Sequence, residues 1–281
     1  MKSVFILLLI IIITLYFIFY KKYYFTNRKK VCVIICGFAP RSFKYVYTSI
    51  QKNIIDKLKT VYDVDTFHYS LLSKKETIES NRPGEVGLKI DNNDVNLLKV
   101  DVLETEYQED IHLTKYVDTG YGDKGDYELN MLRGAYSEYK AIKLFPIKNY
   151  DTCIMVWSDA LILKPINLKH VENTINDKNL LYTTEYNKFG GLANNFYISS
   201  PNTLEKICSR SEIYSEYFKH LKGQTKNAER FVMYTVNKHG IKNKDTDMFY
   251  LKIRAHKKSN HYINLIDNYN IPNSDYYKKK F

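Results

Sequence analysis

Apolar residues along the chain follow two patterns, continuous runs and runs with a spacing of three or four. Residues 31–36 form a continuous apolar run that stops at Gly37, which is typical of a central parallel strand. Residues 45–58 follow with helical spacing, so the two segments predict a strand joined to a helix. The same patterns predict further strands at 61–69, 97–103, 150–166, 179–184 and 248–253, and a glycine turn that leads into a strand at 190–198. Further helices are predicted at 130–145, 168–176, 201–209 and 228–238.

The alternation of these strands and helices determines the predicted fold class. It predicts an α/β fold with a mostly parallel central sheet and helices on both faces, which later strands can join antiparallel. Residues 31–258 are expected to form one domain, preceded by an N-terminal segment (1–30) and followed by a polar C-terminal tail (259–281). Between residues 73 and 127 the pattern loses its period, apart from the short strand at 97–103.

The first 30 residues have a different composition. Residues 3–20 contain no charge and consist mainly of Leu, Ile, Val and Phe. At a rise of about 1.5 Å per residue, this segment is just long enough to cross the apolar part of a bilayer as a helix. Bulky residues at its end, such as Tyr20, argue against a cleaved signal peptide, so a single-pass signal-anchor helix is expected.

The orientation of this anchor follows from the flanking charges. Basic residues are more numerous after the segment than before it, which favours a cytosolic position for the rest of the chain. The four cysteines, which lack the spacing of a disulfide framework or a zinc site, agree with that position. A lumenal placement of the domain is the alternative.

The net charge of +11 is unevenly distributed. Residues 1–30 carry a net +6, residues 31–130 a net −5 and residues 131–281 a net +10. The basic later half would attract phosphates, either of nucleic acid or of a nucleotide-linked substrate. Nucleic acid is not expected as a partner, because the chain has no zinc finger, no RNP aromatic signature and no long basic helix. Solvated surface lysines are the simpler explanation for much of the charge.

Asp159 carries the strongest chemical signal. It lies within the buried strand predicted at 150–166, near the carboxyl end, where open α/β sheets bind their ligands. A carboxylate held there among apolar residues can bind a divalent metal ion or a sugar hydroxyl. The alternative is an acid that caps the turn after a strand.

The order of the segments resembles that of the GT-A class of glycosyltransferases, enzymes that move a sugar from a nucleotide diphosphate to an acceptor. The resemblance spans residues 31–255 and implies a single GT-A-like domain, a nucleotide-sugar donor, and a glycan, protein or lipid acceptor. It is carried by residues 36–41 (Cys-Gly-Phe-Ala-Pro-Arg), 63–67 (Asp-Val-Asp-Thr-Phe), the helix 130–145 with the strand of Asp159, and residues 190–196, 228–231 and 249–254.

The resemblance implies roles in donor binding for several residues. Gly37 would let the backbone approach the nucleotide, and Arg41 would present a fork of donors to the diphosphate. Asp65 would meet the base and ribose. Arg133 and Lys140, which share one face of a helix, would contact the phosphates. The alternatives are that Gly37 is a turn glycine and Arg41 a surface arginine. Asp65 would then be a solvated strand end, and Lys140 a charge on the helix surface.

The resemblance also implies where metal and base would lie. Asp159 stands where such enzymes carry an Asp-x-Asp motif that holds Mn²⁺ or Mg²⁺, but the first position of that motif is Trp157 here. Arg41 is an alternative carrier of the leaving-group charge. Glu229, in the first turn of a late helix, is the candidate base, or else an acid that interacts with the helix dipole. Asn195, with its neighbour Asn194, would hydrogen-bond the donor sugar or the acceptor.

These features together predict a membrane-anchored glycosyltransferase that builds glycans near the bilayer. The broken acidic motif supports an alternative, a binding or scaffolding protein that has kept the fold and lost catalysis.

Overall fold

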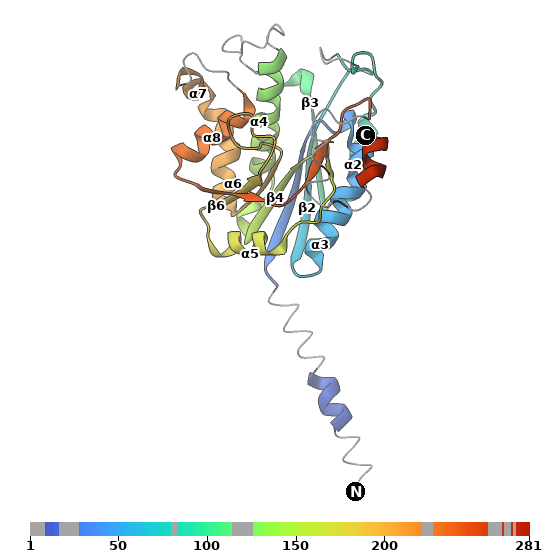
Figure 1. The fold of residues 1–281 in the computed structure, drawn as a ribbon, viewed down its shortest axis with the longest axis vertical. Coiled ribbons are helices and arrows are strands. Elements are labelled where there is room, and N and C mark those ends of the chain that lie inside the picture. The colour runs from blue at the N-terminus through green and yellow to red at the C-terminus, as the bar shows by residue number, and fades with distance from the viewer. Residues whose placement is uncertain are drawn as a thin grey trace.

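The computed structural model describes residues 9–16, 28–79, 84–113, 126–220, 227–257, 266, 271 and 274–281. A seven-stranded sheet in the order β3-β2-β1-β4-β7-β6-β8 forms the centre, with helices on both of its faces (Figure 1). β5 and β9 pair in a separate two-stranded sheet. The strands are β1 (Lys30–Gly37), β2 (Asp63–Leu72), β3 (Val102–Tyr107), β4 (Thr152–Trp157), β5 (Ala160–Ile162), β6 (Leu180–Thr184), β7 (Phe196–Ser199), β8 (Lys242–Thr246) and β9 (Tyr250–Lys252).

The helices pack against the two faces of the central sheet. The helix predicted at 45–58 consists of α2 (Phe43–Ile50), a π-helical segment (Gln51–Ile55) and α3 (Asp56–Lys59). The helices are α2 (Phe43–Ile50), α3 (Asp56–Lys59), α4 (Asp126–Leu144), α5 (Leu168–Asn176), α6 (Pro201–Cys208), α7 (Tyr214–His220), α8 (Ala228–Lys238) and α9 (Ser274–Lys280).

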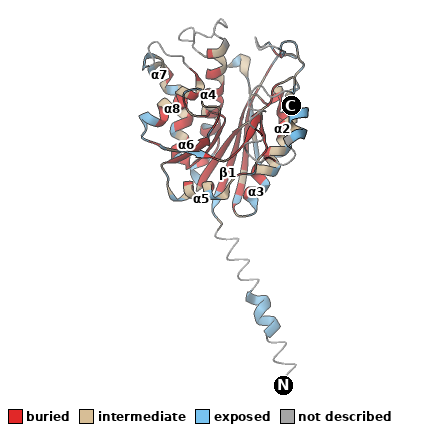
Figure 2. Cartoon of the chain, viewed as in Figure 1, coloured by how far each residue is buried: buried red, intermediate tan, exposed pale blue. Residues whose placement is uncertain are grey.

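Side chains of β1 alternate between two hydrophobic clusters. Val31, Val33 and Ile35 pack with apolar residues of α2, α3 and α5 on one face. The intervening residues, such as Ile34, pack with α4, α6 and α8 on the other face. Figure 2 shows buried residues along the strands between these helices. Because both faces of the strand are covered, its sequence is a continuous apolar run, as the sequence predicts.

The strand order defines a switch point between β1 and β4. β1 is parallel to β2 and to β4, and β2 is parallel to β3. The chain therefore moves from β1 toward one edge and then returns to the other side of β1 with β4. β6 and β8 are also parallel, and only β7 is antiparallel to its neighbours in this sheet, β4 and β6. Most pairings are therefore parallel, and the predicted α/β class with a mostly parallel sheet is confirmed.

The predicted membrane anchor at residues 3–20 lies only partly within the described residues. Residues 9–16 are helical, and their exposed apolar side chains have 46–64% of their surface accessible. Across the part of the chain that the structure describes, every helix is too short or too polar to cross a bilayer. The structure therefore gives no support to the predicted transmembrane helix.

Some residues of the C-terminal tail predicted at 259–281 are buried in the core. Ile266 and Ile271 are buried in the same hydrophobic cluster as α2 and β5. Tyr277 of α9 and Phe281 also pack against that cluster. The described parts of the tail thus contribute to the core. The sequence did not predict this, because the apolar residues of the segment are isolated and follow no periodic pattern.

Candidate functional site

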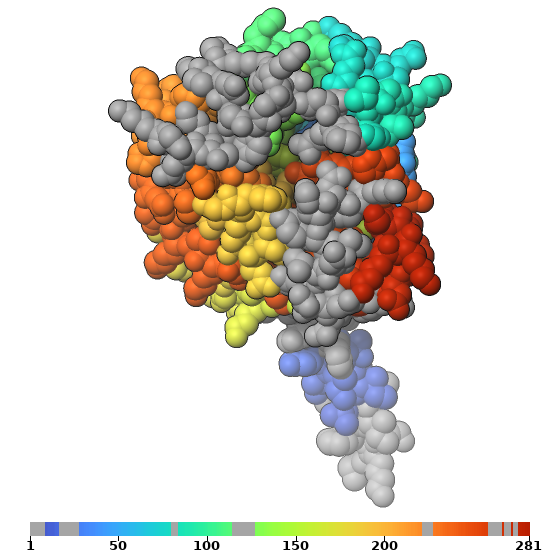
Figure 3. All heavy atoms as spheres, turned by 45° about the horizontal axis from the view of Figure 1, so that its top comes forward, coloured from blue at the N-terminus to red at the C-terminus, as the bar shows by residue number. Residues whose placement is uncertain are grey.

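A cavity of about 610 Å³ lies at the carboxyl ends of β1 and β4, beside the switch point of the sheet. This end of the molecule is turned toward the viewer in Figure 3. β1 begins at the opposite end of the sheet. Among the residues predicted to form the site, those that line the cavity are Gly37, Arg41, Arg133, Asp159 and Glu229.

Gly37 keeps the ends of β1 and β4 close together. Its φ is 115°, a conformation that side chains with a Cβ rarely adopt. A Cβ at this position would also lie 3.1 Å from Ser158 Oγ. The Ser158 N–H donates to the Cys36 carbonyl at 2.9 Å, which extends the contact between the strands by one residue. Glycine at 37 is therefore required by the turn itself, whatever binds next to it.

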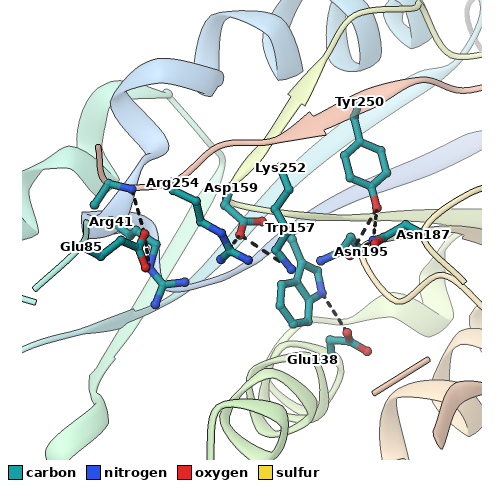
Figure 4. A network of polar contacts seen from close by, with 11 residues as sticks. Arg41, Glu85, Glu138, Trp157, Asp159, Asn187, Asn195, Tyr250, Lys252 and Arg254 are labelled. Carbon is teal, nitrogen blue, oxygen red and sulfur yellow. Dashed lines mark hydrogen bonds and ion pairs between the residues drawn. The ribbon is translucent and has the colours of Figure 1, made fainter. Parts of the chain in front are cut away.

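Asp159 lies in the turn between β4 and β5, with its side chain 8% exposed. Its Oδ2 is 3.8 Å from Arg254 Nη1 and 3.9 Å from Lys252 Nζ, as Figure 4 shows. Its Oδ1 is buried and accepts no hydrogen bond from the residues that the structure describes. One oxygen of the carboxylate is thus held between two cations, and the other has unused hydrogen-bonding capacity.

Trp157 occupies a fixed position beside this carboxylate. Its Nε1 donates to Glu138 Oε1 at 2.9 Å. Its ring packs against α4 at Gly134, where a Cβ would lie 2.5 Å from the ring atom Cη2. Lys252 Nζ is 4.9 Å from the ring centroid, within the range of a cation–π interaction. The indole therefore supports the Lys252 ammonium next to Asp159.

A buried ion pair holds Trp157 from behind. Glu138 is 0% exposed and forms a salt bridge with Arg210, which is 1% exposed. Arg210 Nη1 also donates to the Ile207 carbonyl at 3.1 Å. Burial opposes the charge of Arg210, but the adjacent Glu138 carboxylate outweighs it and raises the pKa of the guanidinium. Arg210 thus stays charged, and its salt bridge with Glu138 fixes the position of the carboxylate that accepts from the indole N–H.

Glu229 is in the first turn of α8, where the sequence predicts a base. The residue is 8% exposed, and burial raises the pKa of the carboxyl above its ordinary value. A backbone hydrogen bond and the charges of Lys252 and Arg210 oppose that shift. A carboxylate with a raised pKa is a stronger base than an exposed one and can accept a proton nearer neutral pH.

The glycine turn before β7 packs directly on the first turn of α8. A Cβ on Gly191 would lie 2.1 Å from the Glu229 carbonyl oxygen, so this contact between two backbones requires glycine. The Leu192 N–H donates to the same carbonyl at 3.0 Å. Asn227 caps α8 by accepting from the Arg230 N–H at 2.7 Å. These contacts determine where Glu229 lies relative to the sheet.

Arg41 follows β1 in a short 3₁₀ turn and lies at the edge of the cavity. Its Nε is 3.9 Å from Glu85 Oε1, and its side chain is 18% exposed. Glu85 is itself 1% exposed and accepts from the Ala255 N–H at 3.0 Å. Arg41 is therefore positioned by a buried carboxylate that the sequence did not single out.

Two predicted residues lie away from the cavity. Asp65 is the third residue of β2, level with Cys32, and accepts from the Tyr150 hydroxyl at 2.7 Å. Because β2 continues to Leu72, the residue level with Gly37 is Ser70, and the interpretation of Asp65 as a strand-end residue is wrong.

Lys140 is the second of these residues. Its Nζ is 3.7 Å from Glu106 Oε2 and 5.7 Å from the centroid of the Tyr136 ring. It is absent from the residues that line the cavity. Although Arg133 and Lys140 belong to the same helix, only Arg133 reaches the cavity wall, so Lys140 is better described as helix-surface charge.

Asn195 is fully buried behind the cavity wall. Its side-chain Oδ1 accepts from Asn187 Nδ2 at 3.0 Å and from the Tyr250 hydroxyl at 3.3 Å. Its backbone carbonyl accepts from the backbone N–H of Trp157 at 3.1 Å. Its neighbour Asn194 lines the cavity, with an Oδ1 that is buried and accepts no hydrogen bond from the described residues. Asn195 therefore supports the site, and Asn194 is the one that faces it.

The residues around Asp159 do not suit the predicted Mn²⁺ or Mg²⁺. These ions require several oxygen ligands, usually with more than one carboxylate. The position of the first acid of the motif is taken by Trp157, and Asp159 Oδ2 already lies within 4 Å of two cationic side chains. Among the described residues, no three His, Cys, Asp or Glu side chains come together as metal ligands.

Lys252 and Arg254 line the cavity beside Asp159, although the sequence did not mark them as site residues. They lie two apart at the end of an apolar strand, so their side chains point to the same side. That spacing was a signal available in the sequence. Its meaning depended on the pairing of β9 with β5, which places Lys252 level with Ala160, next to Asp159.

No protein-family model matches the sequence, and a search of curated proteins also finds no match. The function is therefore argued from the cavity. Its walls combine a buried carboxyl with a raised pKa, a second carboxylate with a free oxygen, and several guanidinium and ammonium groups. This combination suits a ligand that carries phosphate and hydroxyl groups.

Proposed function

We propose that the protein is a glycosyltransferase that moves a sugar from a nucleotide-diphosphate donor to a hydroxyl of a glycan, protein or lipid. The observation that carries the proposal is the convergence of Glu229, Asp159 and Arg41 on one cavity at the switch point of the sheet. Ligands of open α/β sheets bind in this crevice. The GT-A-like order of segments adds to this support.

The proposed reaction is a displacement at the anomeric carbon of the donor. The acceptor oxygen forms a bond to that carbon while the bond from the carbon to the β-phosphate oxygen breaks. The hydroxyl proton passes to Glu229, and the nucleoside diphosphate leaves with the bonding electron pair. Asp159 Oδ1 would accept a hydrogen bond from a donor-sugar hydroxyl, and Arg41 would contact the diphosphate.

Turnover of nucleotide sugars tests the proposal. The full chain, purified in a mild detergent, is incubated with a panel of nucleoside-diphosphate sugars, and the release of nucleoside diphosphate is measured. Glu229→Gln is expected to lower the rate about 10²- to 10⁴-fold, the usual contribution of a general base. Asp159→Asn should also lower it. Asp65→Asn, the same change at an acid outside the cavity, should leave the rate unchanged.

Two results would contradict the proposal. If none of the nucleotide sugars binds, the cavity serves another class of ligand. If a nucleotide sugar binds tightly but neither water nor any offered acceptor consumes it, the alternative of a binding or scaffolding protein with a GT-A-like fold is favoured.

We also propose that residues 3–20 anchor the protein in a membrane. The support is the run of exposed apolar side chains at residues 9–16, which water solvates poorly. The full chain should float with phosphatidylcholine vesicles and resist extraction at alkaline pH. Ile12→Lys should weaken this association, since a lysine at the centre of such a segment costs about 2.5–3.5 kcal/mol. Val86→Lys, at an exposed apolar residue of the domain, should not.

A further inference from the structure

We propose that this site binds the diphosphate of its donor without a divalent metal, because the ammonium of Lys252, together with Arg254, takes the place of the ion. The inference rests on the proposed function and specifies how its leaving group is bound. It follows from a disagreement between the residues present and the metal that the GT-A resemblance implies.

Two cationic side chains lie beside Asp159. Lys252 Nζ and Arg254 Nη1 both lie within 4 Å of Asp159 Oδ2, at 3.9 and 3.8 Å. A metal ion bound to that oxygen would sit beside two positive charges, and Coulomb repulsion would weaken its binding. A diphosphate beside the same groups would instead be attracted by both cations, and this attraction would offset the repulsion from the Asp159 carboxylate.

The Lys252 ammonium is held in place by its strand and by an aromatic ring. The antiparallel pairing of β9 with β5 sets Lys252 opposite Ala160, and the Ile253 N–H donates to the Asp159 carbonyl at 2.9 Å. The ammonium also lies over the ring of Trp157. A cation that is already positioned loses less conformational entropy when it binds an anion than a mobile surface lysine does.

Trp157 stands where the resemblance implies the first acid of a metal-binding motif. Its ring packs against Gly134, and its indole N–H donates a hydrogen bond to the buried Glu138. The residue at 157 thus supplies an aromatic face for a cation rather than an oxygen ligand for a metal. The substitution and the position of Lys252 form one consistent arrangement.

The experiment is a binding titration of the full chain with uridine, guanosine and adenosine diphosphates. Emission from Trp157 reports on the cavity, because it is the only tryptophan in the chain and lines the wall. Calorimetry provides an independent measurement. Each titration is made in EDTA and again with Mn²⁺ or Mg²⁺. One of the diphosphates is expected to bind with the same Kd, within about threefold, under all conditions.

Three variants separate the charge of Lys252 from its packing. Lys252→Met keeps the apolar stem and removes the charge, and it should weaken binding about 10- to 100-fold, as for the loss of a charged hydrogen bond. Lys252→Arg keeps the charge and should bind within about fivefold of the wild type. Lys242→Met, at an exposed lysine of β8 paired with Asp177, should leave binding unchanged.

The outcomes distinguish this inference from the proposed function. Binding that requires Mn²⁺ or Mg²⁺ would overturn the inference and leave the glycosyltransferase proposal intact. Equal binding by Lys252→Met and the wild type in EDTA would also overturn it. If the wild type binds none of the diphosphates with or without metal, the proposed function itself fails, and the inference fails with it.

Discussion

Removal of Arg210 tests how the fold supports the cavity from behind. Arg210 and Glu138 are at most 1% exposed, and Glu138 also accepts from Trp157 Nε1. Arg210→Met keeps much of the side-chain volume but removes the guanidinium. It therefore leaves the Glu138 carboxylate buried without its counter-charge, directly behind the indole that supports Lys252.

The expected cost follows from this burial. Loss of one partner of a buried ion pair costs about 3–5 kcal/mol, out of a total stability of about 5–15 kcal/mol for a typical protein. The double variant Glu138→Gln/Arg210→Met removes both charges, and the new glutamine can still accept from Trp157. Its cost should be about 1–3 kcal/mol, the range for an unmade buried hydrogen bond. The double variant should thus be more stable than the single one.

Urea unfolding of the full chain, followed by the emission of Trp157, measures these differences. With an m-value of about 3 kcal/mol/M, the midpoint of Arg210→Met should fall by about 1–2 M. Lys29→Met is the matched control, because Lys29 forms an exposed ion pair with Asp151 at 3.2 Å. Such pairs contribute about 0–1 kcal/mol, so its midpoint should change little.

The reasoning is refuted if Arg210→Met unfolds within about 1 kcal/mol of the wild type. It is also refuted if the double variant is less stable than Arg210→Met, since the two charges would then not compensate each other.

Three further predictions concern the cavity. Gly134→Ala brings a methyl within 2.5 Å of Trp157, so thermal melts should show a loss of about 1–3 kcal/mol despite the better helix propensity of alanine. Glu229→Gln removes a carboxyl whose pKa is raised by burial; its melting temperature should exceed that of the wild type at pH 8, and the gain should vanish below pH ~4. Lys252→Met removes a charge that lowers the pKa of Glu229, so the acidic limb of the rate profile should move to higher pH, and a shift to lower pH would contradict this role.

The sequence predicts best those elements whose side chains are buried in a regular pattern. The helices at 168–176 and 228–238 were predicted with the bounds that the structure gives them. The edge strand β8 was missed, because Lys-Asn-Lys-Asp-Thr has no apolar alternation and is held by backbone pairing with β6. The strand predicted at 97–103 lies instead at Val102–Tyr107, since an edge strand with mostly exposed side chains has a weakly specified position.

The site was predictable where it depends on strand ends and helix starts. Gly37, Asp159 and Glu229 follow from such boundaries, and the structure brings them to one cavity. Asp65 was misplaced because its level in the sheet depends on the register between β1 and β2, which no local pattern encodes. Lys252 is close to Asp159 through a pairing of strands about 90 residues apart in sequence, and single-segment patterns carry no information on such pairings.

The distribution of buried polar groups favours a binding or catalytic role for the cavity over a purely structural one. Asp159 Oδ1 and Asn194 Oδ1 are buried without hydrogen bonds from the described residues, and Glu229 carries a carboxyl whose charge burial disfavours. Each such group lowers stability, and apolar side chains of similar size would remove the cost. Trp157 shows that an apolar ring can be accommodated two residues from Asp159. These acceptor oxygens support the proposed sugar donor, whose hydroxyl groups would donate the missing hydrogen bonds.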